Sequence, residues 1–124
     1  MAQLRRGDVF FADLGHKCRP YIVVQNDIGN AHSPRTIVVP ITSKIKKYLP
    51  THCVIAYRSI YTSSVHCEEI MQVEVNPCWY AVEHLPPYIM RRIDTALKLR
   101  LVWGDKVCFS VDTLKRTANC QKEK

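Results

Sequence analysis

Short hydrophobic runs separated by polar breaks dominate the first two thirds of the chain. The runs are rich in β-branched and aromatic residues and are bounded by Gly, Pro, Asn and Asp, which is typical of strands. This pattern predicts strands over residues 8–14, 20–25, 35–42, 51–57 and 64–75. Strands at this spacing are typical of a small barrel or sandwich. We therefore expect a mainly β fold.

The break at residues 26–34, NDIGNAHSP, collects residues that favour turns, so we expect a turn that joins two antiparallel strands. Pro40 lies within the second of these strands and has no backbone N–H to donate. Its position predicts a sheet edge or a bulge. Residues 44–50, KIKKYLP, form a basic connection to the next strand.

The periodicity changes after the segment PPY at 86–88, where proline is well placed to start a helix. Apolar residues then recur at intervals of three and four, at Met90, Ile93, Leu97 and Leu101. This stripe predicts one helix over 87–103, capped by Gly104, that covers one side of the barrel. We interpret the stripe as core rather than as an interface.

With 124 residues the chain is long enough for one core, and 47% hydrophobic residues with 23% charged residues are typical of a globular protein. We expect a single domain over 1–104, followed by a polar basic tail over 105–124. No apolar run is long enough to cross a bilayer, and no apolar segment follows the N-terminal arginines. The prediction is therefore a cytoplasmic protein without membrane contact.

Six cysteines are spread along the chain without a CxxC motif: Cys18, Cys53, Cys67, Cys78, Cys108 and Cys120. In a cytosolic protein we expect them to be thiols. Several adjoin a histidine, but adjacent residues of a strand point to opposite faces and do not readily share one tetrahedral ion. We expect no metal and no other cofactor.

The net charge of +7 is concentrated in the first half of the chain, where residues 1–50 carry eight cations and three anions. A positive field of this kind attracts polyanions such as nucleic acid, although it is also typical of a soluble basic surface. A basic segment that includes an aromatic ring combines phosphate-seeking charge with a stacking face, at Lys44, Lys46, Lys47 and Tyr48. A solubilising loop is the alternative interpretation of that segment.

The register of the predicted hairpin has a consequence for two polar residues. If the turn is centred between Asn30 and Ala31, the numbers of paired residues sum to 61, and Arg19 lies opposite Thr42 on the same face. A slip of one residue would separate the two side chains. A lone cation beside a hydroxyl is also typical of a solvated strand end, so the pair alone assigns no function.

A series of motifs in a fixed order surrounds this pair: RRGDVFFADL, RPYIVVQNDIGN, SP, ITS and LPTH. In this order they resemble the MazF/PemK toxins of bacterial toxin–antitoxin modules, over about residues 5–103. The resemblance implies a homodimer of SH3-like barrels, each with a C-terminal helix. It also implies a metal-independent endoribonuclease that cuts single-stranded RNA and leaves a 2′,3′-cyclic phosphate and a 5′-hydroxyl. A cognate acidic antitoxin would fold onto the basic groove.

The resemblance also implies roles for individual residues. Arg19 matches the arginine of the family's RP motif, and a guanidinium suits charge stabilisation on a phosphoryl group. Thr42 matches the threonine of ITS and would bind a non-bridging oxygen. His16 is the candidate general base or acid, with an exposed loop histidine as the alternative. The candidate RNA-binding residues are Ser43, Lys44, Lys46, Lys47, Tyr48, Glu68 and Glu69, of which the last two match a Glu-Gln pair of the family.

Two departures from the family pattern leave other functions open. The family usually has a long Gly-rich loop before the RP motif, whereas this chain has only GHKC at 15–18. Met71 stands where the family commonly has an arginine, which removes a possible phosphate contact. The alternatives are a catalytically inactive member of the same fold that binds RNA or antitoxin, and a toxin that inhibits a protein such as gyrase.

Overall fold

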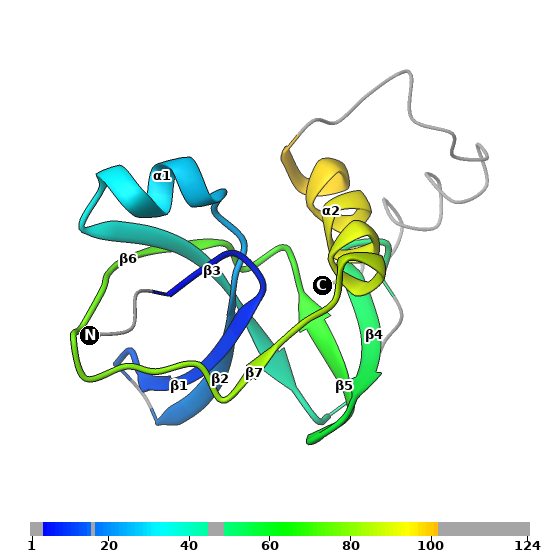
Figure 1. Ribbon diagram of the computed structural model, residues 1–124. Coiled ribbons are helices and arrows are strands. Elements are labelled where there is room, and N and C mark those ends of the chain that lie inside the picture. The colour runs from blue at the N-terminus through cyan, green and yellow to red at the C-terminus, as the bar shows by residue number, and fades with distance from the viewer. Residues whose placement is uncertain (1–3, 16, 45–48, 102–124) are drawn as a thin grey trace.

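The computed structural model describes residues 4–15, 17–44 and 49–101. The strands are β1 (Asp8–Asp13), β2 (Cys18–Val23), β3 (Arg35–Thr42), β4 (His52–Tyr57), β5 (Ile60–His66), β6 (Met71–Glu74) and β7 (Glu83–His84), and the helices are α1 (Asp27–His32) and α2 (Pro87–Leu101). They form one curled antiparallel sheet in the order β4-β5-β3-β2-β1-β7, with β6 paired to β3 (Figure 1). The expected mainly β barrel with a C-terminal helix is confirmed, in the form of a half-barrel.

β3 is the strand that both halves of the sheet share. One side of β3 pairs with β2, and the other side pairs with β6 as far as Val38 and with β5 from Ile41 onward. The Ile37 carbonyl accepts a hydrogen bond from Val24, so by alternation the Pro40 nitrogen faces the β5–β6 side. It falls in the gap between the two pairings, where no donor is needed. The proline that predicted an edge or a bulge therefore marks a change of strand partner.

The predicted hairpin register is confirmed where β2 and β3 pair. The partners are Tyr21 with Pro40, Ile22 with Val39, and Val23 with Val38, and each pair of numbers sums to 61. Extended by two residues beyond these pairs, the same register places Arg19 opposite Thr42.

The connection at 26–34, predicted as a turn, contains the short helix α1. The Asn26 side chain caps it by accepting a hydrogen bond from the Gly29 N–H at 2.8 Å. The buried Asn30 amide accepts from Thr36 at 2.7 Å and from the Gln25 side chain at 3.0 Å. Residues that favour turns also favour helix caps, so composition did not separate the two structures. The motif QNDIGN thus fixes the connection on which the hairpin register depends.

One strand prediction was wrong in detail, and one strand was missed. The predicted strand at 64–75 is two strands, because the chain turns at 67–70 between β5 and β6. β7 was not predicted, since two residues are too few to form a pattern. It is held against β1 by a contact of 2.7 Å between His84 Nδ1 and Asp8 Oδ1, with Asp8 almost fully buried.

The hydrophobic core has two parts, one on each face of the β1–β2–β3 region. The larger part lies between the sheet and α2 and includes Ile22, Ile55 and Ile93. The smaller part lies on the opposite face, where Phe10 stacks on Trp79 with ring centroids 4.9 Å apart. Both faces of β2 are buried from Tyr21 to Val23, which explains the continuous apolar run at the end of that strand.

The helix begins at Pro87 as predicted, and Met90, Ile93 and Leu97 are buried as expected. Leu101 was expected in the same stripe but is 68% exposed, because the last turn of α2 extends past the sheet in Figure 1. The predicted helix end at 103, the Gly104 cap and the tail at 105–124 lie outside the described residues. Within the described ranges, no helix is both long and apolar enough to span a bilayer.

Candidate active site

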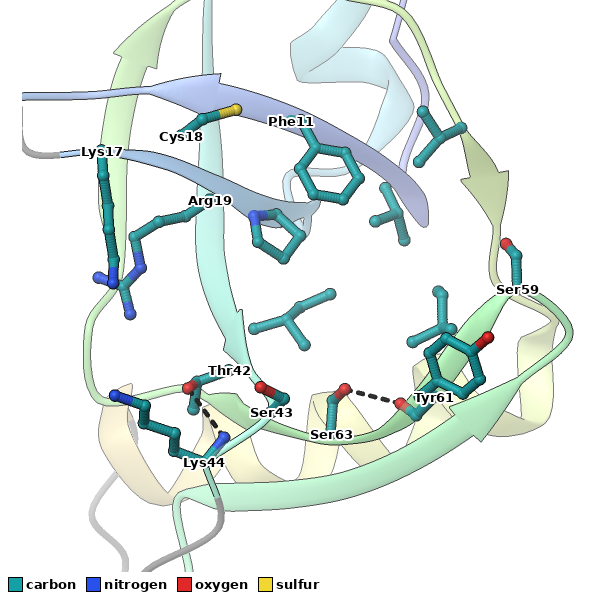
Figure 2. Close-up of a pocket in the computed structure, with 15 residues that line it drawn as sticks. Phe11, Lys17, Cys18, Arg19, Thr42, Ser43, Lys44, Ser59, Tyr61 and Ser63 are labelled. Carbon is teal, nitrogen blue, oxygen red and sulfur yellow. Dashed lines mark hydrogen bonds between the residues drawn. The ribbon is translucent and has the colours of Figure 1, made fainter.

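An open cleft of about 650 Å³ lies between the β1–β2 pair and the β4–β5 pair (Figure 2). Its walls come from the ends of four strands and from the connections that follow them. The lining residues are Val9, Phe11, Lys17, Cys18, Arg19, Pro20, Ile41, Thr42, Ser43, Lys44, Ser59, Ile60, Tyr61, Ser63 and Val82. Arg19 and Thr42 are both among them, as the hairpin register predicted.

One end of the cleft is cationic. Figure 2 shows the side chains of Lys17, Arg19 and Lys44 at this end, beside Thr42. Arg19 belongs to β2, and Lys17 directly precedes that strand, so both cations enter the cleft from the same short segment. Three cations gathered at one partly enclosed site attract an anion more strongly than the same charges spread over a surface. Sequence reasoning missed Lys17, although its spacing from Arg19 was visible.

The Thr42 side chain, at the end of β3, is held by the backbone of Lys44 two residues later. Its Oγ1 accepts a hydrogen bond from the Lys44 N–H at 3.2 Å. A hydroxyl that accepts through its oxygen keeps its own proton available to donate. Thr42 can therefore donate to an anionic oxygen bound beside Arg19, while Ser43 next to it also faces the cleft.

The opposite part of the cleft is aromatic and apolar. Phe11 is 52% exposed and Tyr61 is 86% exposed. Figure 2 shows their rings on different walls, Phe11 from β1 and Tyr61 from β5. Neither was predicted as a site residue, although the adjacent pair Phe10 and Phe11 required one ring to leave the core.

Glu68 and Glu69, predicted to bind RNA, do not line the cleft. Glu68 accepts a hydrogen bond from Thr51 at 3.2 Å and contacts His52 Nε2 at 2.7 Å. Glu69 contacts His66 Nδ1 at 3.1 Å. The predicted residues His16, Lys46, Lys47 and Tyr48 lie outside the described residues. Of the predicted set, the structure brings together Arg19, Thr42, Ser43 and Lys44.

The two histidines beside these glutamates form a stacked pair. The rings of His52 and His66 lie 3.9 Å apart with an angle of 2° between their planes. Together with Glu68 they offer three ligand atoms within 4.8 Å of one another. Because the nitrogen lone pairs of parallel rings lie in parallel planes, they do not converge on one ion in this arrangement. The sequence did not reveal the pair, since it depends on the pairing of β4 with β5.

Burial and hydrogen bonding shift the pKa values of several groups behind the cleft and in the core. Burial acts to raise the pKa of Glu68, but its hydrogen bond with His52 and a backbone hydrogen bond outweigh burial, so the pKa is lowered. Burial raises the pKa of Tyr21 behind the cleft, against the opposing charge of Arg19. Burial also raises the pKa of the Cys67 thiol to about 12. Tyr21 and Cys67 are therefore uncharged at neutral pH.

The four cysteines in the described ranges are free thiols, with Cys53 and Cys67 buried and Cys18 and Cys78 exposed. Burial raises the pKa of Cys53 as well. Buried thiols with raised pKa values are unreactive, since the thiolate is the reactive form.

Comparison with known proteins matches residues 5–101 to the family described as the PemK-like, MazF-like toxin of type II toxin–antitoxin systems. Endoribonuclease EndoA of Bacillus subtilis is 38% identical over 113 residues, which covers 82% of this chain and 97% of that protein. Endoribonuclease MazF of Staphylococcus saprophyticus is 33% identical over 109 residues, covering 79% and 91%.

Among solved structures, an endoribonuclease from a Mycobacterial species, in complex with its cognate antitoxin, matches with a TM-score of 0.72. Its sequence is 26% identical, and the match covers 79% of this chain and 94% of that chain. The half-barrel and its C-terminal helix are thus shared with a solved endoribonuclease.

Proposed function

Since this chain belongs to the PemK-like, MazF-like toxin family of type II toxin–antitoxin systems, we propose that it cleaves single-stranded RNA in the cleft described above. The observation that carries this proposal is the presence of Arg19 and Thr42 in one cleft, at the end where the cations gather. The endoribonuclease names of its relatives support the reaction class.

In the proposed reaction the ribose 2′-hydroxyl attacks the adjacent phosphorus, an O2′–P bond forms, and the P–O5′ bond breaks. The products are a 2′,3′-cyclic phosphate and a 5′-hydroxyl. Negative charge grows on the non-bridging oxygens during attack, and the fixed N–H groups of Arg19 would donate to them. Thr42 would donate its free proton to one of these oxygens and hold the phosphate in line for displacement. No step of this chemistry requires a metal ion.

Lys17 and Lys44 flank this pair and would bind the neighbouring phosphates of the strand. Ser43 would bind beside them, with Lys46, Lys47 and Tyr48 continuing the same basic connection along the chain. Each phosphate neutralised releases counterions, so binding should weaken steeply as salt increases. The 2′-hydroxyl loses its proton to a general base during attack, and the leaving O5′ gains a proton from a general acid, so no net proton is produced. On sequence grounds we propose His16, which adjoins Lys17 in the chain, as the residue that accepts or delivers a proton in these two transfers.

We propose that an acidic antitoxin restrains this activity by covering the cationic end of the cleft. The mycobacterial relative was solved with its cognate antitoxin, which supports a partner of this kind. Opposite charge would also speed the association of the two proteins. We further propose a cytoplasmic homodimer whose two subunits together form the RNA groove.

The test is incubation with single-stranded RNA in excess chelator. We expect cyclic-phosphate ends from the native protein and from Arg91→Ala, an exposed arginine on α2. Arg19→Ala and Thr42→Val should each lose about 10²–10³-fold in cleavage rate, the usual effect of removing one oxyanion donor. Full cleavage by Arg19→Ala, or cleavage only after a metal ion is added, would refute the mechanism.

A second candidate is a non-catalytic member of the same fold, which the short loop at 15–18 favours. Met71, at the position of a common family arginine, packs against the smaller core cluster and does not line the cleft. Salt-sensitive RNA binding without cleavage would select this candidate. If the protein neither binds nor cleaves RNA, the result would select the third alternative, a toxin that inhibits a protein.

A further inference from the structure

The aromatic part of the cleft has no role in the reaction proposed above. Phe11 and Tyr61 both line the cleft and keep 52% and 86% of their surface exposed. Val82, 41% exposed, adds an apolar side chain to the same walls. Isolated exposed apolar residues are common, but here they gather inside one cleft whose other end is cationic.

The two ends of the cleft match the two parts of a nucleotide. Cations and the Thr42 hydroxyl suit a phosphate, whereas an exposed aromatic ring suits the face of a base. Figure 2 shows the rings on different walls and away from the three cations, so one bound strand can reach both kinds of surface. The cleft volume of about 650 Å³ lies within the roughly 300–1,000 Å³ of sites for small organic ligands.

The wall that carries Tyr61 is fixed by hydrogen bonds within the protein. Ser63 Oγ donates to the Tyr61 carbonyl at 2.6 Å, and Ser59 Oγ donates to Glu83 at 3.0 Å, which ties the β4–β5 turn to β7. These two cleft hydroxyls use their protons within the protein and leave them unavailable to acceptors on a base edge. The surface around Tyr61 therefore offers a ring face for stacking, while the two serine hydroxyls cannot donate to a base.

From this arrangement we propose that Phe11 and Tyr61 are stacking platforms for unpaired nucleobases of the strand whose phosphate lies at the cationic end. The identity of the ligand as RNA rests on the proposed function. A base inside a duplex already has neighbours on both faces, so such platforms select single-stranded substrate. Because every base has an aromatic face, they hold the strand with little preference for base identity.

The experiment measures binding without cleavage. A short oligonucleotide with 2′-O-methyl groups throughout lacks the attacking hydroxyl, and 2-aminopurine placed at successive positions loses fluorescence when it stacks. Tyr61→Ala and Phe11→Leu should each weaken binding by roughly 5- to 100-fold, the equivalent of one lost stack, and should abolish quenching at one position. Tyr61→Phe should bind like the native protein, and so should Tyr88→Ala, which removes a comparably exposed ring on α2.

Native affinity and native quenching in both Tyr61→Ala and Phe11→Leu would overturn the proposal. A second refuting result is a change in the oligomeric state of free Tyr61→Ala with quenching unchanged, because the ring would then pack against a second copy. Circular dichroism of each variant separates loss of binding from loss of folding. The assay is independent of cleavage: quenching that depends on Tyr61, in a protein that cuts no RNA, would refute the proposed reaction and support the platforms.

Discussion

Gly29 in α1 offers a prediction whose sign depends on one neighbouring side chain. A Cβ added at Gly29 would lie 2.9 Å from Gln25 Cδ and 3.0 Å from Gln25 Nε2, closer than real Cβ contacts. Gln25 is not free to move away without loss, because its Nε2 donates to Asn30 Oδ1 at 3.0 Å and to the Arg35 carbonyl at 3.1 Å. Gly29→Ala therefore has to displace a side chain that holds the hairpin connection.

Two opposing free energies set the effect of Gly29→Ala on the stability of the protein. Alanine is favoured over glycine within a helix by about 1 kcal/mol. Loss of the two Gln25 hydrogen bonds costs about 1 kcal/mol each. We therefore expect Gly29→Ala to destabilise the native protein by about 1 kcal/mol. In a Gln25→Ala background nothing is displaced, so the same change should stabilise the protein by about 1 kcal/mol.

The assay is urea unfolding of the native protein, the two single variants and the double variant, with free energies compared as a double-mutant cycle. The expected coupling between the two positions is about 2 kcal/mol. If Gly29→Ala stabilises the protein equally in both backgrounds, Gln25 does not constrain α1 and the reasoning is refuted.

Three further predictions concern stability. Folding lowers the pKa of Glu68, so the carboxylate contributes to stability above the ordinary pKa of 4.5, and this contribution is lost as pH falls through the folded pKa. Urea unfolding at several pH values should therefore show that the difference in unfolding free energy between the native protein and Glu68→Gln shrinks below pH 4.5. Ile93→Ala should cost about 2–5 kcal/mol because the side chain is fully buried, whereas Leu101→Ala should cost less than about 0.5 kcal/mol, and equal losses in thermal unfolding would contradict the burial difference. Asp8→Ala should cost about 1.5–3 kcal/mol, because Asp8 accepts from the Arg5 N–H at 2.7 Å and contacts His84, and an unchanged urea midpoint would show that neither contact matters.

The parts of the fold that rest on alternation were predictable. Opposed residues of a hairpin follow from the centre of its turn, which predicted Arg19 opposite Thr42, and both residues line one cleft. The start of α2 followed from its proline and its apolar stripe. In each case one local pattern was sufficient.

Other parts depend on contacts between distant segments. β7 depends on contacts between distant segments: His84 contacts Asp8, and the Leu85 N–H donates to the Gly7 carbonyl. Both contacts span more than 70 residues of chain, so no local pattern predicts them. Glu68 was predicted to bind RNA from its motif, but the fold places it beside His52, which the sequence separates by 16 residues. Tyr61 enters the cleft because β5 begins four residues earlier than predicted.

The position of β3 between three other strands determines which residues of this protein can be substituted without disturbing the sheet. A substitution along that strand disturbs packing toward β2, β5 or β6, and Thr42 at its end moves with it. The side chains of Phe11 and Tyr61 are exposed at the rim of the cleft, so substitutions there disturb the packing of the sheet less and act mainly on what the cleft binds. We therefore expect relatives of this chain to keep the packing of β3 and to differ more at the rim of the cleft.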